Sequence, residues 1–276
     1  SHFYTDFYLK NARKIFSNSR FIPRISSRAH SMLDDSLVTD FPFRTLLWWG
    51  KQSKMKNSSK SHIYDFYLKQ GQEFAASVEV LLRKKQRKCD GKPFFLGFDS
   101  ASLETLEYIK AEGGIGVVDQ IDAAKMEDEI VLNEAELWPL FQRSYERIPE
   151  PYFERVEAEW DLSDLVLVNS QWTKDSLIKQ GVPESKIMII PLAYDAPTET
   201  LNRRFGKGRK DSLKVLWLGQ VTIGKGIQYL VEALRLVRSK KIVAEVFGPI
   251  KISEEAFGTF PPNMDVKGPL PRSRVA

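Results

Sequence analysis

Short apolar segments alternate with helix-forming segments between residues 94 and 247, and this alternation restricts the fold more than any other feature of the chain. Each apolar segment is four or five residues long, with turn-forming residues near its ends. Such segments are typical of strands buried on both faces of a parallel sheet and joined by right-handed βαβ connections. The predicted strands are Phe94–Phe98, Ile115–Val118, Leu165–Val168, Ile187–Ile190, Val215–Leu218 and Val243–Phe247. The sequence therefore predicts an α/β fold with parallel sheets.

The segments between these strands carry helix signals. Ser170 can accept a hydrogen bond from a free amide at the start of its helix, and prolines break the long acidic segment near Pro149 and Pro151. The predicted helices are Ser102–Glu112, one or two within Met126–Glu159, Trp172–Gln180 and Ile227–Lys240. A further helix pattern begins at Gln70, after a polar stretch over 51–62 that we interpret as a mobile loop.

The alternation is interrupted over Tyr194–Lys210, which separates two predicted sheets. We therefore expect an N-terminal Rossmann-like domain over 1–200 and part of a second over 201–276. Ligands of such sheets bind beyond the carboxyl ends of the strands. The residues expected there are Asp99, Asp119, Asn169, Asp195, Gln220, Lys225 and Gly248.

The segment Leu213–Gly226, LKVLWLGQVTIGKG, joins an apolar strand to a glycine-rich turn with one lysine. Gly219 and Gly224 allow backbone amides to converge on an anion at the start of the following helix, and Lys225 adds a positive charge. The spacing matches the first seven positions of a P-loop, but Gly226 replaces the Ser or Thr that binds magnesium there. The turn indicates phosphate binding without that metal site; an ordinary turn with a solvated lysine is the structural alternative.

Composition excludes several classes of protein. The chain has 276 residues, one cysteine, and three histidines without metal-ligand spacing. No apolar run approaches the ~20 residues of a membrane span, and the N-terminus has no signal-peptide pattern. A lone cysteine cannot form an internal disulfide, which favours a reducing cytoplasm. We predict no metal and no cofactor.

Charge is distributed unevenly along the chain. Residues 1–92 carry 18 basic and 8 acidic side chains, residues 93–200 carry 8 and 22, and residues 201–276 carry 15 and 6. Two basic flanks around an acidic middle favour an anionic ligand or surface over a continuous nucleic-acid interface. A solvated surface of uneven charge is the alternative.

The run Phe41–Trp49 combines aromatic residues with Arg44 and is followed by Lys51. This composition suits the membrane interface or a lipid-linked acceptor, and it suits core packing equally well. We predict a cytoplasmic protein and leave a peripheral membrane contact open.

Two segments resemble retaining glycosyltransferases of the GT-B fold, in the glycosyl transferases group 1 family. They are DLVLVNSQWTKDSLIKQGVPESKIMIIPLAYD over Asp164–Asp195 and LKVLWLGQVTIGKGIQYLVEALRLV over Leu213–Val237. The resemblance covers the chain from about Phe94 onward. It implies two Rossmann-like domains, with a nucleotide-activated sugar bound by the second, and places its diphosphate near Gly219, Lys225 and Gly248.

The chain departs from the family at two positions of the expected site. Gln220 stands where many members have an arginine, so it can donate a hydrogen bond to a phosphate oxygen but cannot neutralise it. Asp119 follows a strand where many members have a histidine. A carboxylate there can orient an acceptor hydroxyl or take its proton, and it can equally be a solvated strand end. A pair of glutamates typical of the family's second domain has no counterpart after residue 200.

From these features we predict a hexosyltransferase-type enzyme of polysaccharide biosynthesis. It would transfer a sugar from a nucleoside diphosphate sugar to a hydroxyl of a glycan or lipid-linked acceptor, with no nucleic-acid partner. The alternatives are a P-loop-like phosphotransferase and a non-catalytic phosphate-binding module. The chain begins without methionine, and only two strands of the second sheet are predicted. We therefore expect a fragment that lacks the first N-terminal strand and the end of the second domain, and that is inactive alone.

Overall fold

The structure is a computed structural model that describes residues 2–5, 34–55, 58–86, 91–142, 145–193, 213–237, 241–271 and 274. The chain divides into two compact units. Unit 1 comprises residues 1–121, 148–167 and 182–188, and unit 2 comprises residues 122–147, 168–181 and 189–276. The predicted domain break over Tyr194–Lys210 lies outside the described residues.

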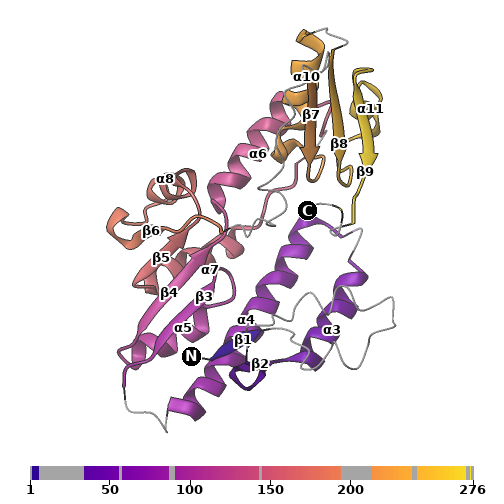
Figure 1. Cartoon of the computed structure of the whole chain (residues 1–276). Coiled ribbons are helices and arrows are strands. Elements are labelled where there is room, and N and C mark those ends of the chain that lie inside the picture. The colour runs from indigo at the N-terminus through magenta and orange to yellow at the C-terminus, as the bar shows by residue number, and fades with distance from the viewer. Residues whose placement is uncertain are drawn as a thin grey trace, which may run out of the picture. The chain divides into compact units, whose positions relative to one another are not determined.

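The first main sheet has four strands in the order β3-β4-β5-β6 (Figure 1). β3 (Phe94–Phe98) pairs in parallel with β4 (Ile115–Gln120). β5 (Leu165–Val168) and β6 (Ile187–Ile189) complete the sheet. The sequence predicted all four strands, and β4 is longer than predicted by two residues.

Three helices form a layer with this sheet. α5 (Leu103–Ala111) and α7 (Glu150–Leu162) pack on its strands, and α4 (Lys60–Gln86) packs on α5. Pro149 is the N-cap of α7 and Pro151 lies in its first turn. The prolines therefore start this helix, as their fixed φ favours.

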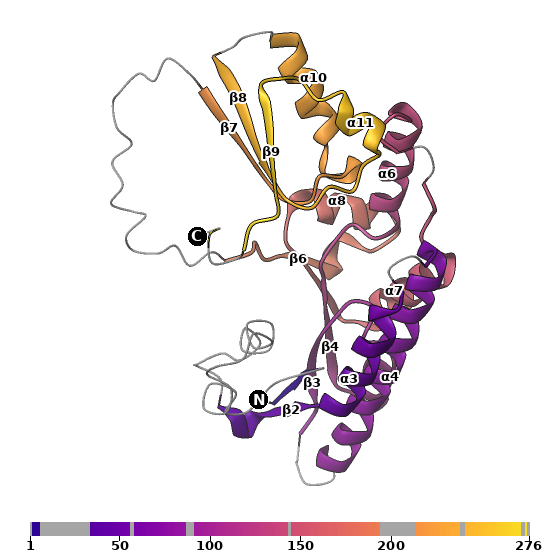
Figure 2. The same ribbon diagram turned by 90° about the vertical axis from the view of Figure 1, so that its right-hand side faces the viewer.

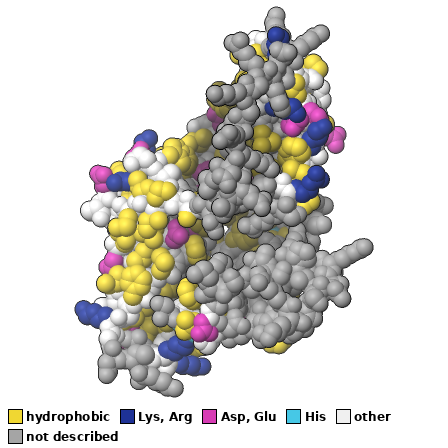
Figure 3. All heavy atoms as spheres, in the orientation of Figure 1, with side chains coloured by type: hydrophobic (Ala, Val, Ile, Leu, Met, Phe, Trp, Pro, Cys, Tyr) yellow, Lys and Arg dark blue, Asp and Glu magenta, His cyan; other side chains and the backbone are white. Residues whose placement is uncertain are grey.

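Hydrophobic side chains on one face of β3, in the first sheet, are exposed. Phe94, Leu96 and Phe98 alternate along β3 and are 68%, 55% and 62% exposed. Figure 3 shows hydrophobic side chains gathered over this part of the molecule. The period-two pattern of a strand puts these three residues on one face, while Gly97 faces the opposite side next to Ser102.

The segment before residue 90 differs from the prediction of a loop over 51–62. α3 (Pro42–Ser53) extends into that stretch, and α4 already begins at Lys60 rather than near Gln70. Ser59 caps α4, since its Oγ accepts a hydrogen bond from the amide of His62 at 3.2 Å. Two short strands, β1 (Phe3–Thr5) and β2 (Val38–Asp40), pair in parallel and were not predicted; a 3-10 turn, η1 (Asp35–Leu37), precedes β2.

The second sheet has three parallel strands in the order β7-β8-β9. β7 is Leu213–Leu218, β8 is Ile242–Phe247 and β9 is Met264–Gly268. The expectation of only two strands was wrong. β9 reads Met-Asp-Val-Lys-Gly and escaped prediction because its charged residues, Asp265 and Lys267, form an ion pair on an exposed side of the strand.

The core of unit 2 joins the second sheet to residues far away in sequence. α6 (Lys125–Leu137) runs beside α10 (Ile227–Val237) in both ribbon views (Figures 1 and 2). Ala135 and Phe141 share one buried cluster with residues of the second sheet and of α10. Residues 122–147 thus pack with the second sheet, although they lie on the N-terminal side of the predicted boundary at residue 200.

The remaining elements are short. α8 (Gln171–Lys179) begins after Ser170, whose side chain accepts a hydrogen bond from the Thr173 amide as predicted. A 3-10 turn, η2 (Glu184–Lys186), precedes β6, and α11 (Glu254–Gly258) precedes β9. The prediction of an α/β fold with parallel sheets is confirmed. No helix in the described part of the chain is both long and apolar enough to cross a lipid bilayer.

Candidate functional site

The predicted phosphate-binding turn begins where β7 and β8 end side by side. The amide of Gly219 donates to the carbonyl of Phe247 at 2.9 Å, and the amide of Gly248 donates to that of Gly268 at 2.9 Å. Gly248 has a φ of 149°, and a Cβ built on it would lie 1.7 Å from the Gly219 carbonyl oxygen. Only glycine allows this approach, so Gly248 fixes the position from which the turn departs.

The turn then folds back before α10. Val221 is fully buried and forms an isolated parallel bridge with Ile250, so the chain still follows the neighbouring strand segment three residues after β7 ends. A 3-10 turn, η3 (Ile223–Lys225), follows, and Gly226 closes it with a φ of 81°. This left-handed conformation at Gly226 starts α10 at Ile227. The first amides of a helix have no acceptor inside it and favour an anion.

Lys225 is the last residue of η3 and is exposed. Its ammonium forms no ion pair with any residue that the structure describes. Gln220 is exposed at the start of the same turn. The turn therefore presents one cation and one amide side chain to solvent, next to a helix N-terminus. This arrangement can bind a phosphate.

Helix α6 packs directly against this turn. A Cβ at Gly224 would lie 3.1 Å from Cγ2 of Val131, so the helix and η3 are in van der Waals contact at that point. One turn earlier on α6 lies Glu127, whose pKa is raised by burial and by Asp122 and is lowered in part by Lys225. The Glu127 carboxylate thus lies within electrostatic range of the candidate phosphate lysine.

A second set of contacts holds α6 to the start of α10. Nε2 of Gln228 donates to Oε2 of Glu134 at 2.9 Å and to the carbonyl of Ile223 at 3.2 Å. The Tyr229 hydroxyl donates to the same carboxylate at 2.7 Å, which raises the pKa of Tyr229. Gln228 is fully buried. These hydrogen bonds fix the position of the glycine-rich turn relative to α6.

Unit 1 contains the predicted acceptor-side residue. Asp119 lies near the end of β4 and is partly exposed. Its carbonyl accepts from the amide of Asp99 at 3.2 Å, whereas its carboxylate has no hydrogen-bond partner among the described residues. The side chain is therefore available to a ligand, as the prediction requires.

The neighbouring polar residues at this strand end are used internally. Gln120 is buried, accepts from Nε1 of Trp160 at 2.8 Å and donates to Oδ2 of Asp99 at 3.4 Å. Asp99, predicted as a ligand position, is itself only 9% exposed. Among Asp99, Asp119 and Gln120, Asp119 is the most accessible.

The start of α5 is occupied by a carboxylate of the chain itself. Glu159 on α7 accepts from the amides of Ser100 at 2.6 Å, Ser102 at 2.9 Å and Leu103 at 3.0 Å. Burial raises the pKa of Glu159 to about 7, although these amides and Arg155 lower it. The Glu159 carboxylate therefore occupies three amides of this strand-to-helix turn that a phosphate would otherwise bind.

Arg155 completes the closure of that turn. It binds the Glu104 carboxylate through both terminal nitrogens, at 2.8 and 2.7 Å, and its Nε donates to the Ser100 carbonyl at 2.8 Å. Ser100 has a φ of 64°, unusual for a residue other than glycine. The side chains of Glu159, Arg155 and Glu104 thus hold the loop in one conformation.

The other predicted ligand positions contribute less. Oδ1 of Asn169 accepts from the Thr173 hydroxyl at 3.3 Å, within the cap of α8. Asp195 lies outside the described residues. The lone cysteine, Cys89, which was not predicted to bind a ligand, also lies outside them. Over the described ranges, no group of three or more His, Cys, Asp or Glu could hold a metal ion.

Sequence reasoning missed Glu127 and Glu159. Both lie in the acidic segment between the predicted strands Ile115–Val118 and Leu165–Val168, where nothing in the order of residues shows which carboxylates turn inward. A signal existed for Glu159, since α7 needs a buried face and Phe153, Val156 and Trp160 mark it at helical spacing. Glu159 lies on the same face.

No protein-family model matches this sequence, and no curated protein is similar to it. Solved structures with a similar course of the chain include a UDP-N-acetylglucosamine 2-epimerase from Listeria monocytogenes, with 11% identity and a TM-score of 0.39 over 86% of this chain and 61% of that one. An S. aureus MnaA–UDP complex has 11% identity and a TM-score of 0.33, with 84% and 60% covered. A UDP-GlcNAc 2-epimerase from Neisseria meningitidis bound to UDP-GlcNAc has 13% sequence identity and a TM-score of 0.34, and the match covers 84% of this chain and 64% of that one. The chain therefore spans less than two thirds of the length of these three proteins.

Proposed function

We propose that this chain binds the diphosphate of a nucleoside diphosphate sugar at the turn between β7 and α10, as part of a glycosyltransferase. The observation that carries this proposal is the contrast between two strand-to-helix turns. The turn before α5 is filled by the Glu159 carboxylate. The turn before α10 has an exposed lysine, Lys225, without an ion pair to any described residue.

The chemistry follows from the charge that develops during sugar transfer. The bond between the anomeric carbon and the diphosphate oxygen breaks, and a bond from that carbon to the acceptor hydroxyl oxygen forms. The leaving diphosphate gains negative charge, which Lys225 and the first amides of α10 stabilise more strongly in the transition state than in the substrate. The Gln220 side chain can donate a hydrogen bond to the same group.

The acceptor hydroxyl must lose its proton as it attacks. We propose Asp119 as the group that orients this hydroxyl or takes its proton, since its carboxylate is partly exposed and has no partner among the described residues. Asp119 and Lys225 belong to different units, so this assignment rests on each residue's own surroundings. A glycan or a lipid-linked hydroxyl is the acceptor class that we propose.

The phosphotransferase alternative is weakened by Gly226. A P-loop places a magnesium-binding hydroxyl at that position, whereas here a residue in the left-handed conformation starts α10. A non-catalytic phosphate-binding module would keep the Lys225 turn and have no use for Asp119. Substitution of Asp119 therefore distinguishes the glycosyltransferase, which should lose activity, from the non-catalytic module, which should be unaffected.

The experiment is in two parts. Calorimetric titration of this chain with UDP, GDP and ADP, with and without magnesium, tests the phosphate turn and identifies the base. A sugar-transfer assay on the full-length protein and on its Asp119→Asn variant tests catalysis. Nucleotide binding that is unchanged while transfer falls would support the enzyme; transfer equal to wild type in Asp119→Asn would remove Asp119 from the mechanism. No binding of any nucleoside diphosphate would refute the proposal.

A further inference from the structure

Helix α3 has two faces of opposite character. Thr45 is fully buried and Trp48 is 5% exposed, and Nε1 of Trp48 donates to Oε2 of Glu73 on α4 at 3.2 Å. On the other face, Phe43 is 85% exposed and Leu47 is 68% exposed. Leu46, at 52%, continues the exposed side. The three residues follow the i, i+3, i+4 spacing of one helix face.

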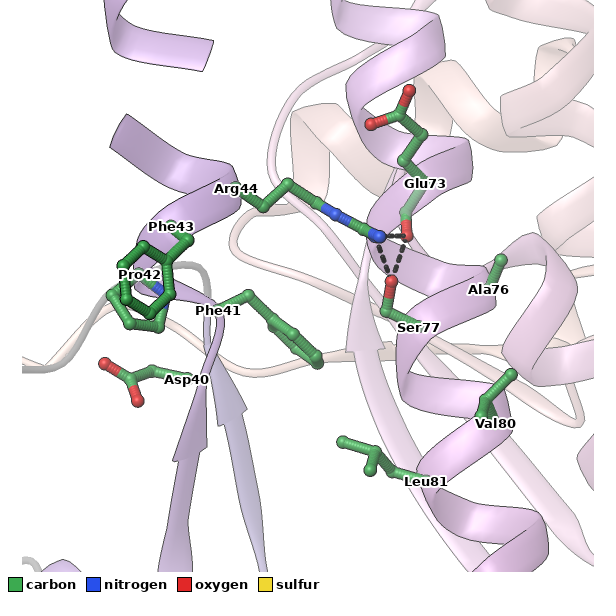
Figure 4. Close-up of a pocket in the computed structure, with 10 residues that line it drawn as sticks. All are labelled: Asp40, Phe41, Pro42, Phe43, Arg44, Glu73, Ala76, Ser77, Val80 and Leu81. Carbon is green, nitrogen blue, oxygen red and sulfur yellow. Dashed lines mark hydrogen bonds between the residues drawn. The ribbon is translucent and has the colours of Figure 1, made fainter. Parts of the chain in front are cut away.

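Polar contacts fix which face points outward. A terminal nitrogen of Arg44 donates to the carbonyl of Glu73 at 2.6 Å and to the hydroxyl of Ser77. Figure 4 shows this side chain reaching from α3 to α4. With Trp48 also anchored to Glu73, the helix cannot rotate to bury Phe43 or Leu47 without breaking these hydrogen bonds. The apolar face is therefore a stable feature of unit 1.

A cavity of about 700 Å³ adjoins the same face, between the start of α3 and α4. Phe43 lines it and also belongs to the exposed stripe, so the cavity and the stripe are continuous. The charged residues of the lining are Asp40, Arg44 and Glu73, and Arg44 donates to the carbonyl of Glu73. The side chains around it are mostly hydrophobic (Figure 4). The lining includes Phe41, Pro42, Phe43, Ala76, Val80 and Leu81.

Positive charge lies at one end of this surface. Lys51 and Lys54 follow Leu47 by four and seven residues, which places them beside the stripe at the end of the helix, and both are exposed. In sequence, residues 42–64 contain five basic residues and no acidic residue. An apolar face bordered by lysines matches a helix that lies in the interface of an anionic membrane.

We propose that unit 1 binds an anionic lipid surface through α3, with Phe43, Leu46 and Leu47 inserted among the headgroups and Lys51 and Lys54 against the anionic charge. The charge argues for this partner, because Lys51 and Lys54 beside the apolar stripe complement an anionic surface. The proposal is independent of the nucleotide site in unit 2. A membrane surface would bring the chain to a lipid-linked acceptor.

The test is co-sedimentation of the chain with vesicles of phosphatidylcholine alone or with 30% phosphatidylglycerol. We expect binding to the anionic vesicles that weakens with added salt, and at least tenfold weaker binding for Phe43→Ser/Leu47→Ser. The matched control is Leu236→Ser/Val237→Ser on α10, where the side chains are 80% and 50% exposed. This control should bind vesicles as the wild type does.

A charge variant, Lys51→Gln/Lys54→Gln, separates the two contributions. We expect it to weaken binding to anionic vesicles several-fold and to reduce the salt dependence. Circular dichroism and nucleotide titration should be unchanged in both variants, because all four side chains are exposed. Equal vesicle binding by wild type and Phe43→Ser/Leu47→Ser would overturn the proposal. The proposal would also be overturned if the wild type bound no vesicles but formed a concentration-dependent dimer that Phe43→Ser/Leu47→Ser abolished.

Discussion

The carbonyl oxygen of Gly219 occupies the space that a side chain on Gly248 would need. A Cβ on Gly248 would lie 1.7 Å from that oxygen, and the φ of 149° disfavours any other residue. The ends of β7 and β8 therefore approach each other this closely only because residue 248 is a glycine. The phosphate turn leaves the sheet at this contact.

Gly248→Ala should destabilise unit 2 by about 3 kcal/mol or more, since backbone must move to admit the methyl group. Thermal unfolding followed by circular dichroism measures the change. The matched control is Gly258→Ala on α11, where a Cβ has nothing within 4 Å. If both variants melt together with the wild type, the close approach of the two strands is wrong.

Lys225→Ala should weaken the binding of a nucleoside diphosphate about tenfold to a hundredfold, because a hydrogen bond from a charged group contributes about 1.5–3 kcal/mol. Calorimetry on the chain gives the affinity. Lys214→Ala is the control, since Lys214 is an exposed lysine at the opposite end of β7, paired with Glu245 at 3.1 Å. In the full-length enzyme the same change at Lys225 should lower turnover severely; an effect within a few-fold would show that the lysine has another role.

Glu127→Gln should strengthen diphosphate binding several-fold, because it removes a negative charge near Lys225. Burial and Asp122 raise the pKa of Glu127, so the wild-type carboxyl gains its proton at a higher pH than usual. The wild type should therefore bind the anion more tightly as pH falls through that raised pKa, and the variant should show only the ligand's own titration. Glu136→Gln, an exposed position on α6, is the control. Identical pH profiles for wild type and Glu127→Gln would contradict the electrostatic contact.

Glu159 should make the stability of unit 1 depend on pH. Its pKa is about 7 in the folded chain against an ordinary value of 4.5, so the folded chain holds one more proton between these values. The contribution of Glu159 to the free energy of unfolding is then largest below pH 4.5. It falls by about 3 kcal/mol as the pH rises to 7.

Urea unfolding of the wild type and of Glu159→Gln between pH 4.5 and 7 measures this effect, as the difference between the pH dependences of their unfolding free energies. The glutamine keeps an acceptor for the Ser102 and Leu103 amides but does not titrate, so the variant should lose the slope. Parallel curves for the two proteins would show that Glu159 titrates as an ordinary carboxyl.

Much of the fold could be predicted because its strands are locally encoded. The runs Phe94–Phe98 and Leu165–Val168 are apolar, short and bounded by turn residues, and the structure has them with the same limits. β9 and the start of α4 were missed for the opposite reason. Half of β9 faces solvent and carries charge. The first turn of α4 begins with the polar residues Lys60, Ser61 and His62, and so does not show the apolar periodicity of a helix.

The sequence by itself determined the parallel α/β architecture and the glycine-rich turn with Lys225, because periodicity, apolar runs and glycine conformations are local properties. Tertiary structure alone decided that α6 packs on that turn and brings Glu127 near Lys225, that Glu159 fills the start of α5, and that Phe43 and Leu47 point outward while Trp48 points in. Each of these depends on residues far apart in the chain, or on which face of a helix meets its neighbour. A carboxylate or an aromatic ring looks the same in sequence whether it is solvated or buried, and only packing distinguishes the two.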